Sequence, residues 1–231
     1  MKPVNVFHGV PHRHVHDKDI EAHITEISKE FRDGFNFMKK YPRSVTIYGS
    51  ARTQPDTLEW RKAEELGRKI VTNLHYAVVT GGGPGIMAAA HKGAQDVGGN
   101  AVALGISLPH ELNTNSFATD RLQFTYFFAR KTMLDFATEA CVFFPGGFGT
   151  FDELFSTLTL VQTRKIPSVP IILFGCEYWN ELLIFIKKEM FKHHSAITDN
   201  DMNIFKITDD VDEIIEIVRT SPVADWWRNI N

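Results

Sequence analysis

The residues best suited to binding or catalysis are Glu153 and the glycine-rich segment 145–150 that precedes it. The segment follows an apolar run, residues 140–144, which is typical of a strand buried on both faces, and it leads into a run typical of a helix. A glycine turn at the start of a helix can direct several backbone N–H groups at one anion. The predicted anion-binding residues are Gly146, Gly147, Gly149 and Thr150.

Glu153 needs its own explanation, because a carboxylate next to a bound phosphate would be repelled. One interpretation is structural, since a glutamate in the first turn of a helix complements the helix dipole. The other is chemical: the carboxylate is the group that acts on a phosphorylated substrate.

Three other segments of unusual composition, residues 49–52, 81–85 and 129–131, also follow predicted strands. Ligands bind beyond the carboxyl ends of parallel strands, so we expect all of these segments to meet at one edge of a sheet. The residues expected to complete the pocket are Ser50, Arg52, Gly82, Gly83, Gly85, Met87, Arg130 and Lys131. Such a set suits a phosphorylated substrate whose reacting centre lies near Glu153. Taken alone, Arg130 would be interpreted as a surface or ion-paired arginine.

These segments must be held by a scaffold in which strands and helices alternate. Strands are predicted at residues 44–48, 76–80, 101–106, 122–128, 140–144, 170–174 and 205–207. Helices are predicted at 19–35, 55–74, 86–97, from 129 onward, and at 154–161, 178–193 and 209–219, the last capped by Thr208 or Asp209. Residues 107–121 are expected to form a long loop. The alternation predicts a single doubly wound, Rossmann-like α/β domain over residues 19–220, with a mostly parallel sheet of about seven strands and helices on both faces.

A polar arm, residues 1–18, and a tail, residues 221–231, lie outside this domain. The arm contains four histidines at chelating spacing: His8, His12, His14 and His16. A flexible or partner-packed arm is the preferred interpretation, and no metal site is predicted, because no carboxylate or cysteine cluster accompanies them. Trp226 and Trp227 of the tail are expected to pack on this chain or on a partner subunit.

Length and composition set further bounds. A chain of 231 residues suits one domain with a sizeable core, and its net charge of -3 gives no broad attraction to nucleic acid or to a membrane. Cys141 and Cys176 each adjoin an apolar run and are expected to be buried free thiols in a reducing compartment. No apolar run approaches a membrane span and no signal peptide opens the chain, so a cytoplasmic location is expected.

Two common nucleotide-binding motifs fit less well. A kinase-like P-loop is excluded, because no glycine-rich loop is followed by Gly-Lys-Ser/Thr. Residues 83–88 match the Gly-x-Gly-x-x-Ala pattern of dinucleotide-binding proteins, but residues 104–107, at the end of the next strand, include no acid to bind the ribose. Because a lone match of this motif is weak, dinucleotide redox chemistry is kept only as an alternative.

Residues 145–153, Pro-Gly-Gly-Phe-Gly-Thr-Phe-Asp-Glu, resemble the Pro-Gly-Gly-x-Gly-Thr-x-x-Glu signature of the LOG ("lonely guy") proteins, long mislabelled as lysine decarboxylases. Residues 81–87 resemble the family's earlier glycine loop, and residues 129–131 resemble its Arg-Lys pair. The resemblance covers about residues 43–220. The chain departs from the family at Ala88, where a glutamate often follows the methionine.

The resemblance implies a phosphoribohydrolase, which cleaves the N-glycosidic bond of a nucleoside 5′-monophosphate such as AMP or a cytokinin riboside monophosphate. It also implies a homodimer or higher homo-oligomer that needs no metal or organic cofactor. Glu153 would stabilise the oxocarbenium-like transition state and activate water, Arg130 would orient the small-molecule substrate, and the 146–150 loop would hold the 5′-phosphate.

Two alternatives stay open. A non-catalytic nucleotide or phospho-ligand carrier could use the same fold, although the presence of both Arg130 and Glu153 argues against it. Amino-acid decarboxylation, the older family label, lacks a lysine in a recognisable pyridoxal phosphate site.

Overall fold

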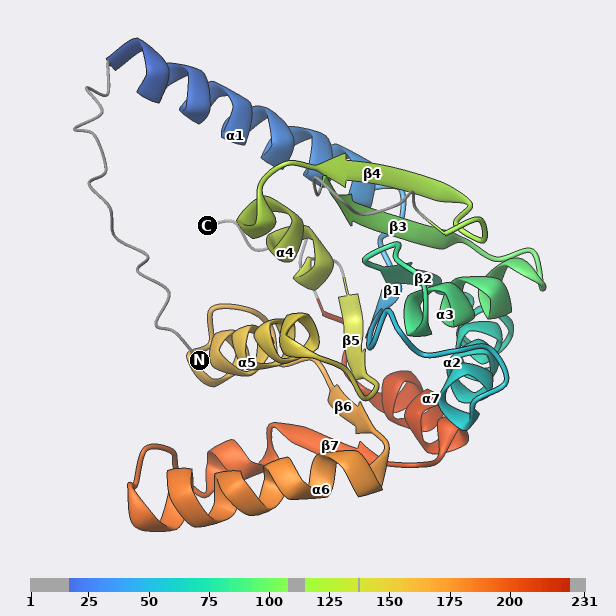
Figure 1. Ribbon diagram of the computed structural model, residues 1–231, viewed down its shortest axis with the longest axis vertical. Helices are drawn as coiled ribbons and strands as arrows, with labels where there is room; N and C mark the ends of the chain where they lie inside the picture. The colour runs from blue at the N-terminus through green and yellow to red at the C-terminus, as the bar shows by residue number, and fades with distance from the viewer. Residues whose placement is uncertain (1–16, 108–114, 137, 225–231) are drawn as a thin grey trace, which may run out of the picture.

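A seven-stranded parallel sheet forms the centre of the computed structural model, which describes residues 17–107, 115–136 and 138–224 (Figure 1). The strands are β1 (Ser44–Tyr48), β2 (Ala77–Thr80), β3 (Ala101–Ile106), β4 (Asp120–Phe124), β5 (Thr138–Phe143), β6 (Ile171–Phe174) and β7 (Phe205–Thr208). Their order is β4-β3-β2-β1-β5-β6-β7, and every neighbouring pair is parallel. The predicted doubly wound α/β fold is confirmed.

Helices cover both faces of this sheet. The α-helices are α1 (Asp17–Met38), α2 (Leu58–Lys69), α3 (Ile86–Gln95), α4 (Phe127–Asp135), α5 (Phe148–Gln162), α6 (Cys176–Phe185) and α7 (Val211–Thr220). The π-helical turns η1 (Ile70–Leu74) and η2 (Ile186–His193) extend α2 and α6, and a 3-10 turn, η3 (Asn200–Asn203), precedes β7. One apolar core joins α2, α3 and α7 to the sheet, and the other joins α1, α4, α5 and α6.

Burial explains the two kinds of strand sequence. The central strands β1, β2 and β5 are buried at every position, and apolar residues form the majority in each of them. The edge strands β4 and β7 are only partly buried. The residues that leave β1, β2 and β5 therefore follow strands that are buried along their whole length.

The fourth predicted strand is too long, because a side chain from α1 ends it. β4 stops at Phe124, four residues before the predicted end. The carboxylate of Glu30 accepts hydrogen bonds from the backbone N–H groups of Thr125, at 2.6 Å, and Tyr126, at 3.1 Å. The chain then turns into α4, whose first helical hydrogen bond runs from the N–H of Arg130 to the carbonyl of Tyr126. Helix α1 thus helps to set where α4, the helix that carries Arg130, begins.

The cap of the last helix also differs from the prediction. Asp210, and not Thr208 or Asp209, accepts a hydrogen bond from the N–H of Asp212 at 2.8 Å. Asp209 accepts instead from the N–H of Cys176, at 2.8 Å. This bond joins the start of α6 to the end of β7, and it explains why Asp209 does not cap α7.

Several predictions concern residues outside the described ranges. These are residues 1–16 of the histidine-rich arm, residues 108–114 of the predicted loop and the two tail tryptophans. In the ranges that are described, no helix has the length and apolar character needed to span a membrane. The same ranges hold no group of three or more His, Cys, Asp or Glu side chains arranged for a metal ion. Both cysteines are free, but only Cys141 is fully buried, and Cys176 is partly exposed.

Candidate active site

The sheet changes its direction of growth between β1 and β5. Strands β2, β3 and β4 lie on the β1 side, and β6 and β7 lie on the β5 side. In parallel sheets of this kind, ligands bind beyond the carboxyl ends of the strands at such a switch point. Predicted site segments 49–52 and 145–150 leave from these two strands, and they touch where the N–H of Ser50 donates to the carbonyl of Pro145 at 3.0 Å.

The first glycine turn, residues 81–85, is locked against the segment that follows β1. The N–H of Ile86 donates to the carbonyl of Ser50 at 3.0 Å. Gly85 has a φ of +67°, and a Cβ there would lie 2.1 Å from that same carbonyl oxygen. The side chain of Met87 lies over the turn, with its Cε 2.7 Å from where a Cβ of Gly83 would be. Only glycine allows this close packing at Gly85.

The second glycine turn begins α5. Gly147 is the N-cap residue and supplies no side chain to the first N–H groups of the helix. A Cβ at Gly147 or Gly149 would meet nothing within 4 Å, so both face open space. Thr150 is buried, and a Cβ at Gly146 would lie 2.1 Å from its hydroxyl oxygen. A helix N-terminus with accessible backbone is suited to bind a phosphate.

Glu153 lies deeper than the first turn of α5. No acidic residue occupies that turn, so the interpretation of Glu153 as a first-turn partner of the helix dipole is wrong. Its side chain is 8% exposed, and within the described residues its buried Oε2 has no hydrogen-bond partner. Burial raises the pKa of Glu153 to about 7, although the positive charges of Arg130 and Lys131 oppose this rise.

Arg130 is held beside Glu153 by contacts from the neighbouring strands. Its Nε donates to the carbonyl of Leu104, at the end of β3, at 2.8 Å. A Cβ at Gly81 would lie 2.2 Å from Arg130 Nη2, so the glycine leaves room for the guanidinium. Arg130 Nη1 lies 3.8 Å from Glu153 Oε1, and the arginine side chain is only 15% exposed. Arg130 is therefore not a surface arginine.

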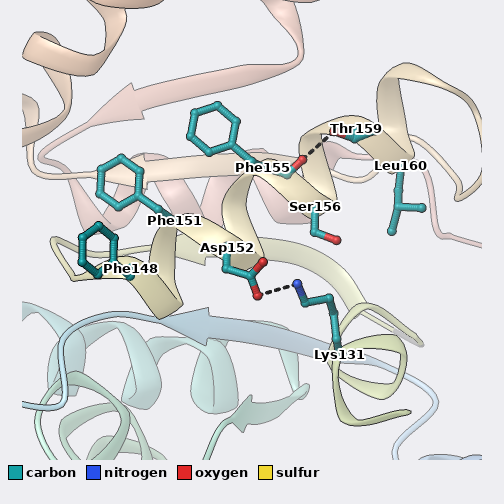
Figure 2. A pocket seen from close by; sticks show the side chains of 8 residues that line it. All are labelled: Lys131, Phe148, Phe151, Asp152, Phe155, Ser156, Thr159 and Leu160. Atoms are coloured by element: carbon teal, nitrogen blue, oxygen red, sulfur yellow. Dashed lines mark hydrogen bonds and ion pairs between the residues drawn. The ribbon is translucent and has the colours of Figure 1, made fainter. Parts of the chain in front are cut away.

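Lys131 does not join this pair. Its Nζ lies 2.5 Å from Asp152 Oδ2, and both side chains face a hollow of about 630 Å³ along the outward side of α5 (Figure 2). Arg52 is exposed, and its backbone N–H donates to the hydroxyl of Ser50 at 3.1 Å. The structure thus gathers Glu153, Arg130 and both glycine turns, while Lys131 and Arg52 lie at the periphery.

Comparison with known proteins identifies the family. Residues 87–218 match the family model described as "Possible lysine decarboxylase", and they make up more than half of the chain. This chain belongs to the LOG family. Two curated relatives bear the name cytokinin riboside 5′-monophosphate phosphoribohydrolase. The one from Rhodococcoides fascians is 28% identical over 154 residues, which cover 63% of this chain and 75% of the relative. The one from Arabidopsis thaliana is 27% identical over 152 residues, which cover 64% and 69%.

Solved structures share the LOG-type fold. The molybdenum cofactor binding protein from Rippkaea orientalis matches with a TM-score of 0.54 at 20% identity, over 77% of this chain and 94% of that protein. At this level of identity the likeness concerns the fold alone.

Sequence reasoning missed several polar residues under the LOG site. Asp135, Tyr48 and Thr157 surround the inner side of Glu153, and His91 and Asn115 lie under the first glycine turn. Asp135 and His91 each interrupt an apolar helical stretch, and such an interruption is the signal that could have found them. Ala88, the departure from the family pattern, is buried in α3.

Proposed function

We propose that this LOG-family chain hydrolyses the N-glycosidic bond of a nucleoside 5′-monophosphate, either AMP or a cytokinin riboside monophosphate, to a free base and ribose 5-phosphate. The observation that carries the proposal is the buried carboxyl of Glu153, 3.8 Å from Arg130, between two glycine turns at the switch point of the sheet. The names of the two curated relatives support the same reaction.

In this proposal the glycine turn at residues 146–150 binds the 5′-phosphate and so fixes C1′ of the ribose near Glu153. Water attacks C1′ as the bond to the base breaks, and its proton passes to Glu153. The base leaves with the bonding electrons and takes up a proton from solvent water, and Glu153 returns its proton to solvent. A carboxyl whose pKa is about 7 suits this role, because it is partly ionised at neutral pH and still basic. The ionised carboxylate also stabilises positive charge that develops on the sugar ring.

Arg130 would orient the substrate and offset its negative charge. Its guanidinium is fixed by the Leu104 carbonyl on one side and faces Glu153 on the other, so little reorganisation would be needed when the nucleotide binds. No step of the proposed reaction requires a metal ion or an organic cofactor.

The enzyme is proposed to act as a homodimer in the cytoplasm. The outward side of α5 supports self-association, because Phe148 is 96% exposed there and Phe151 and Phe155 line the adjacent hollow. Light scattering of the purified chain should give twice the mass of one chain, and a monomeric mass would contradict the dimer.

The deciding experiment is an assay of the purified chain against a panel of purine, pyrimidine and cytokinin nucleoside monophosphates. Release of free base together with an equal amount of ribose 5-phosphate would support the hydrolase. The alternative, a nucleotide or phospho-ligand carrier, predicts binding by calorimetry without release from any member of the panel. Such a result would overturn the enzyme proposal and leave the fold assignment intact.

A further inference from the structure

A second buried carboxyl lies on the inner side of Glu153. Asp135 is the last residue of α4, and it is 3% exposed. Its Oδ1 accepts hydrogen bonds from the hydroxyl of Thr157, at 3.0 Å, and from the hydroxyl of Tyr48, at 3.4 Å. Its Oδ2 is buried and, within the described residues, has no hydrogen-bond partner.

Thr157 connects this carboxyl to Glu153. It lies one helical turn after Glu153 on α5, and its hydroxyl oxygen is 2.9 Å from the Glu153 carbonyl oxygen as well as 3.0 Å from Asp135 Oδ1. The hydroxyl carries one proton and can donate it to either oxygen. A change in the charge of Asp135 therefore acts, through Thr157, on the turn of α5 that carries Glu153.

The position of Asp135 is difficult to explain by stability alone. The nearby cations are already engaged elsewhere, since Lys131 pairs with Asp152 and Arg130 faces Glu153. A buried carboxylate without a cation partner costs folding free energy, and an apolar side chain of similar size would avoid that cost. Within the described ranges, two buried side-chain oxygens have no hydrogen-bond partner. One is Asp135 Oδ2 and the other is Glu153 Oε2.

We propose that Asp135 and Glu153 form a coupled carboxyl pair, in which Asp135, held by Tyr48 and Thr157, sets how readily Glu153 takes up a proton. Asp135 is thus a positioning residue, because it acts on the reaction only through Glu153. The catalytic consequence rests on the proposed function, whereas the coupling of the two carboxyls does not.

The charges around the pair agree with this coupling. Burial raises the pKa of Asp135 to about 6, so Asp135 is largely ionised near the midpoint of Glu153, whose pKa is about 7. The negative charge of Asp135 then helps to keep that proton on Glu153. The other titratable groups that face the pair are Arg130 and Lys131 of α4, Asp152 of α5, Tyr48 of β1 and Cys141 of β5. Burial raises the pKa values of Tyr48 and Cys141, so both stay neutral.

Asp135→Asn tests the pair, because it removes the charge and keeps the shape. The ionisation of Glu153 is followed by the carbon-13 signal of its carboxyl in the ligand-free protein, assigned by its loss in Glu153→Gln. We expect the midpoint to fall by about half a pH unit or more. If the chain hydrolyses nucleotides, the acid limb of its pH–rate profile should move to lower pH by the same amount.

Glu139→Gln is the matched control. Glu139 is also a buried carboxyl, but it lies near the start of β5, whereas the segment that leads to Glu153 leaves the end of that strand. Glu139 accepts a hydrogen bond from the N–H of Ala224. Its removal should leave the midpoint of Glu153 unchanged.

Thr157→Val provides a second test, which does not depend on whether Asp135→Asn folds. The hydrogen bond from Thr157 lowers the pKa of Asp135, so its loss should leave Asp135 neutral to a higher pH and again lower the midpoint of Glu153. An unchanged midpoint in a folded Asp135→Asn, or in Thr157→Val if the former does not fold, overturns the coupling. A shifted midpoint in a protein that releases no base from any nucleotide would uphold the pair and reject the proposed function.

Discussion

A glutamate in water is ionised at neutral pH, and Glu153 differs because α5 buries it beside Arg130. We therefore expect Glu153→Gln to lower kcat roughly 10³-fold, since the amide cannot accept the proton of the attacking water. Nucleotide affinity should change little, because in the proposed function the turn at residues 146–150, and not Glu153, binds the phosphate. The measurement is kcat by base release, together with the Kd for AMP by calorimetry.

Asp152→Asn serves as the control for this substitution. Asp152 is the neighbouring carboxylate on α5, but it is 63% exposed and faces the outer hollow (Figure 2). Its loss should change kcat by less than about twofold. Near-normal turnover in Glu153→Gln would remove Glu153 from the reaction.

Arg130 and Lys131 are adjacent in the sequence, but their side chains pair with different carboxylates. Arg130→Ala should lower kcat/KM roughly 10²-fold, because it removes the cation that faces both Glu153 and the expected substrate. Lys131→Ala should lower it less than about tenfold, because Lys131 is already paired with Asp152 on the outer side of α5. Steady-state kinetics with AMP would measure both effects. Equal losses would mean that Lys131 turns toward the substrate.

At the scale of elements, the first glycine turn is held from below by a buried polar network. The amide nitrogen of Asn115 donates to the carbonyls of Gly82 and Gly83, at 3.0 Å each. His91 lies 3.2 Å from that amide nitrogen, and its Nε2 lies 3.1 Å from the carbonyl of Val102. Burial lowers the pKa of His91 to about 4, so the ring is neutral, and its Nδ1 also lies 3.3 Å from the Oδ1 of Asn115.

Asn115→Ala should therefore loosen this turn. Two hydrogen bonds of about 1 kcal/mol each are lost, so we expect KM for the nucleotide to rise roughly tenfold with a smaller change in kcat. The backbone amides of Gly82, Gly83 and Gly85 should also exchange hydrogen faster. The control is Asn100→Ala, which changes an exposed asparagine before β3, at the opposite end of the sheet. An unchanged KM with unchanged exchange would show that the turn is rigid without Asn115.

At the scale of the whole molecule, the sequence predicted what depends on local periodicity. The buried strands β1, β3 and β5 lie within two residues of their predicted positions, because their apolar runs are buried on both faces. The end of β4 could not be predicted, because Glu30, far away in the sequence, fixes it through Thr125 and Tyr126. The same limit applies to helix caps that depend on residues far away in the sequence, such as Asp209, which bonds to Cys176.

The candidate site divides in the same way. Each glycine turn is a continuous stretch of the sequence, and so is the signature that contains Glu153. The spacing of their residues therefore indicates the chemistry that they could perform. The pairing of Lys131 with Asp152, and the hydrogen bond from Thr157 to Asp135, depend on which side of a helix faces the core. That information comes only from the packed structure.

The buried carboxyls also predict how the stability of the whole molecule depends on pH. Glu153 and Asp135 keep their protons in the folded state up to pKa values of about 7 and 6, whereas the unfolded chain releases them near 4.5 and 3.8. The folded state therefore binds more protons between about pH 4 and 7, and their contribution to the free energy of unfolding falls as the pH rises through this window. His91 acts in the opposite direction over a similar range, because its pKa is lowered from 6.5 to about 4.

Comparing wild type with Glu153→Gln isolates the glutamate, because the contributions of other groups, including His91, largely cancel. The variant lacks a group that is destabilised when it ionises, so its Tm relative to wild type should rise by about 5 °C between pH 5 and pH 8. Calorimetric scans of both proteins across this range provide the measurement. A difference in Tm that stays constant with pH would mean that Glu153 ionises in the folded state as freely as in water, and its assignment as a buried base poised near neutral pH would then be wrong.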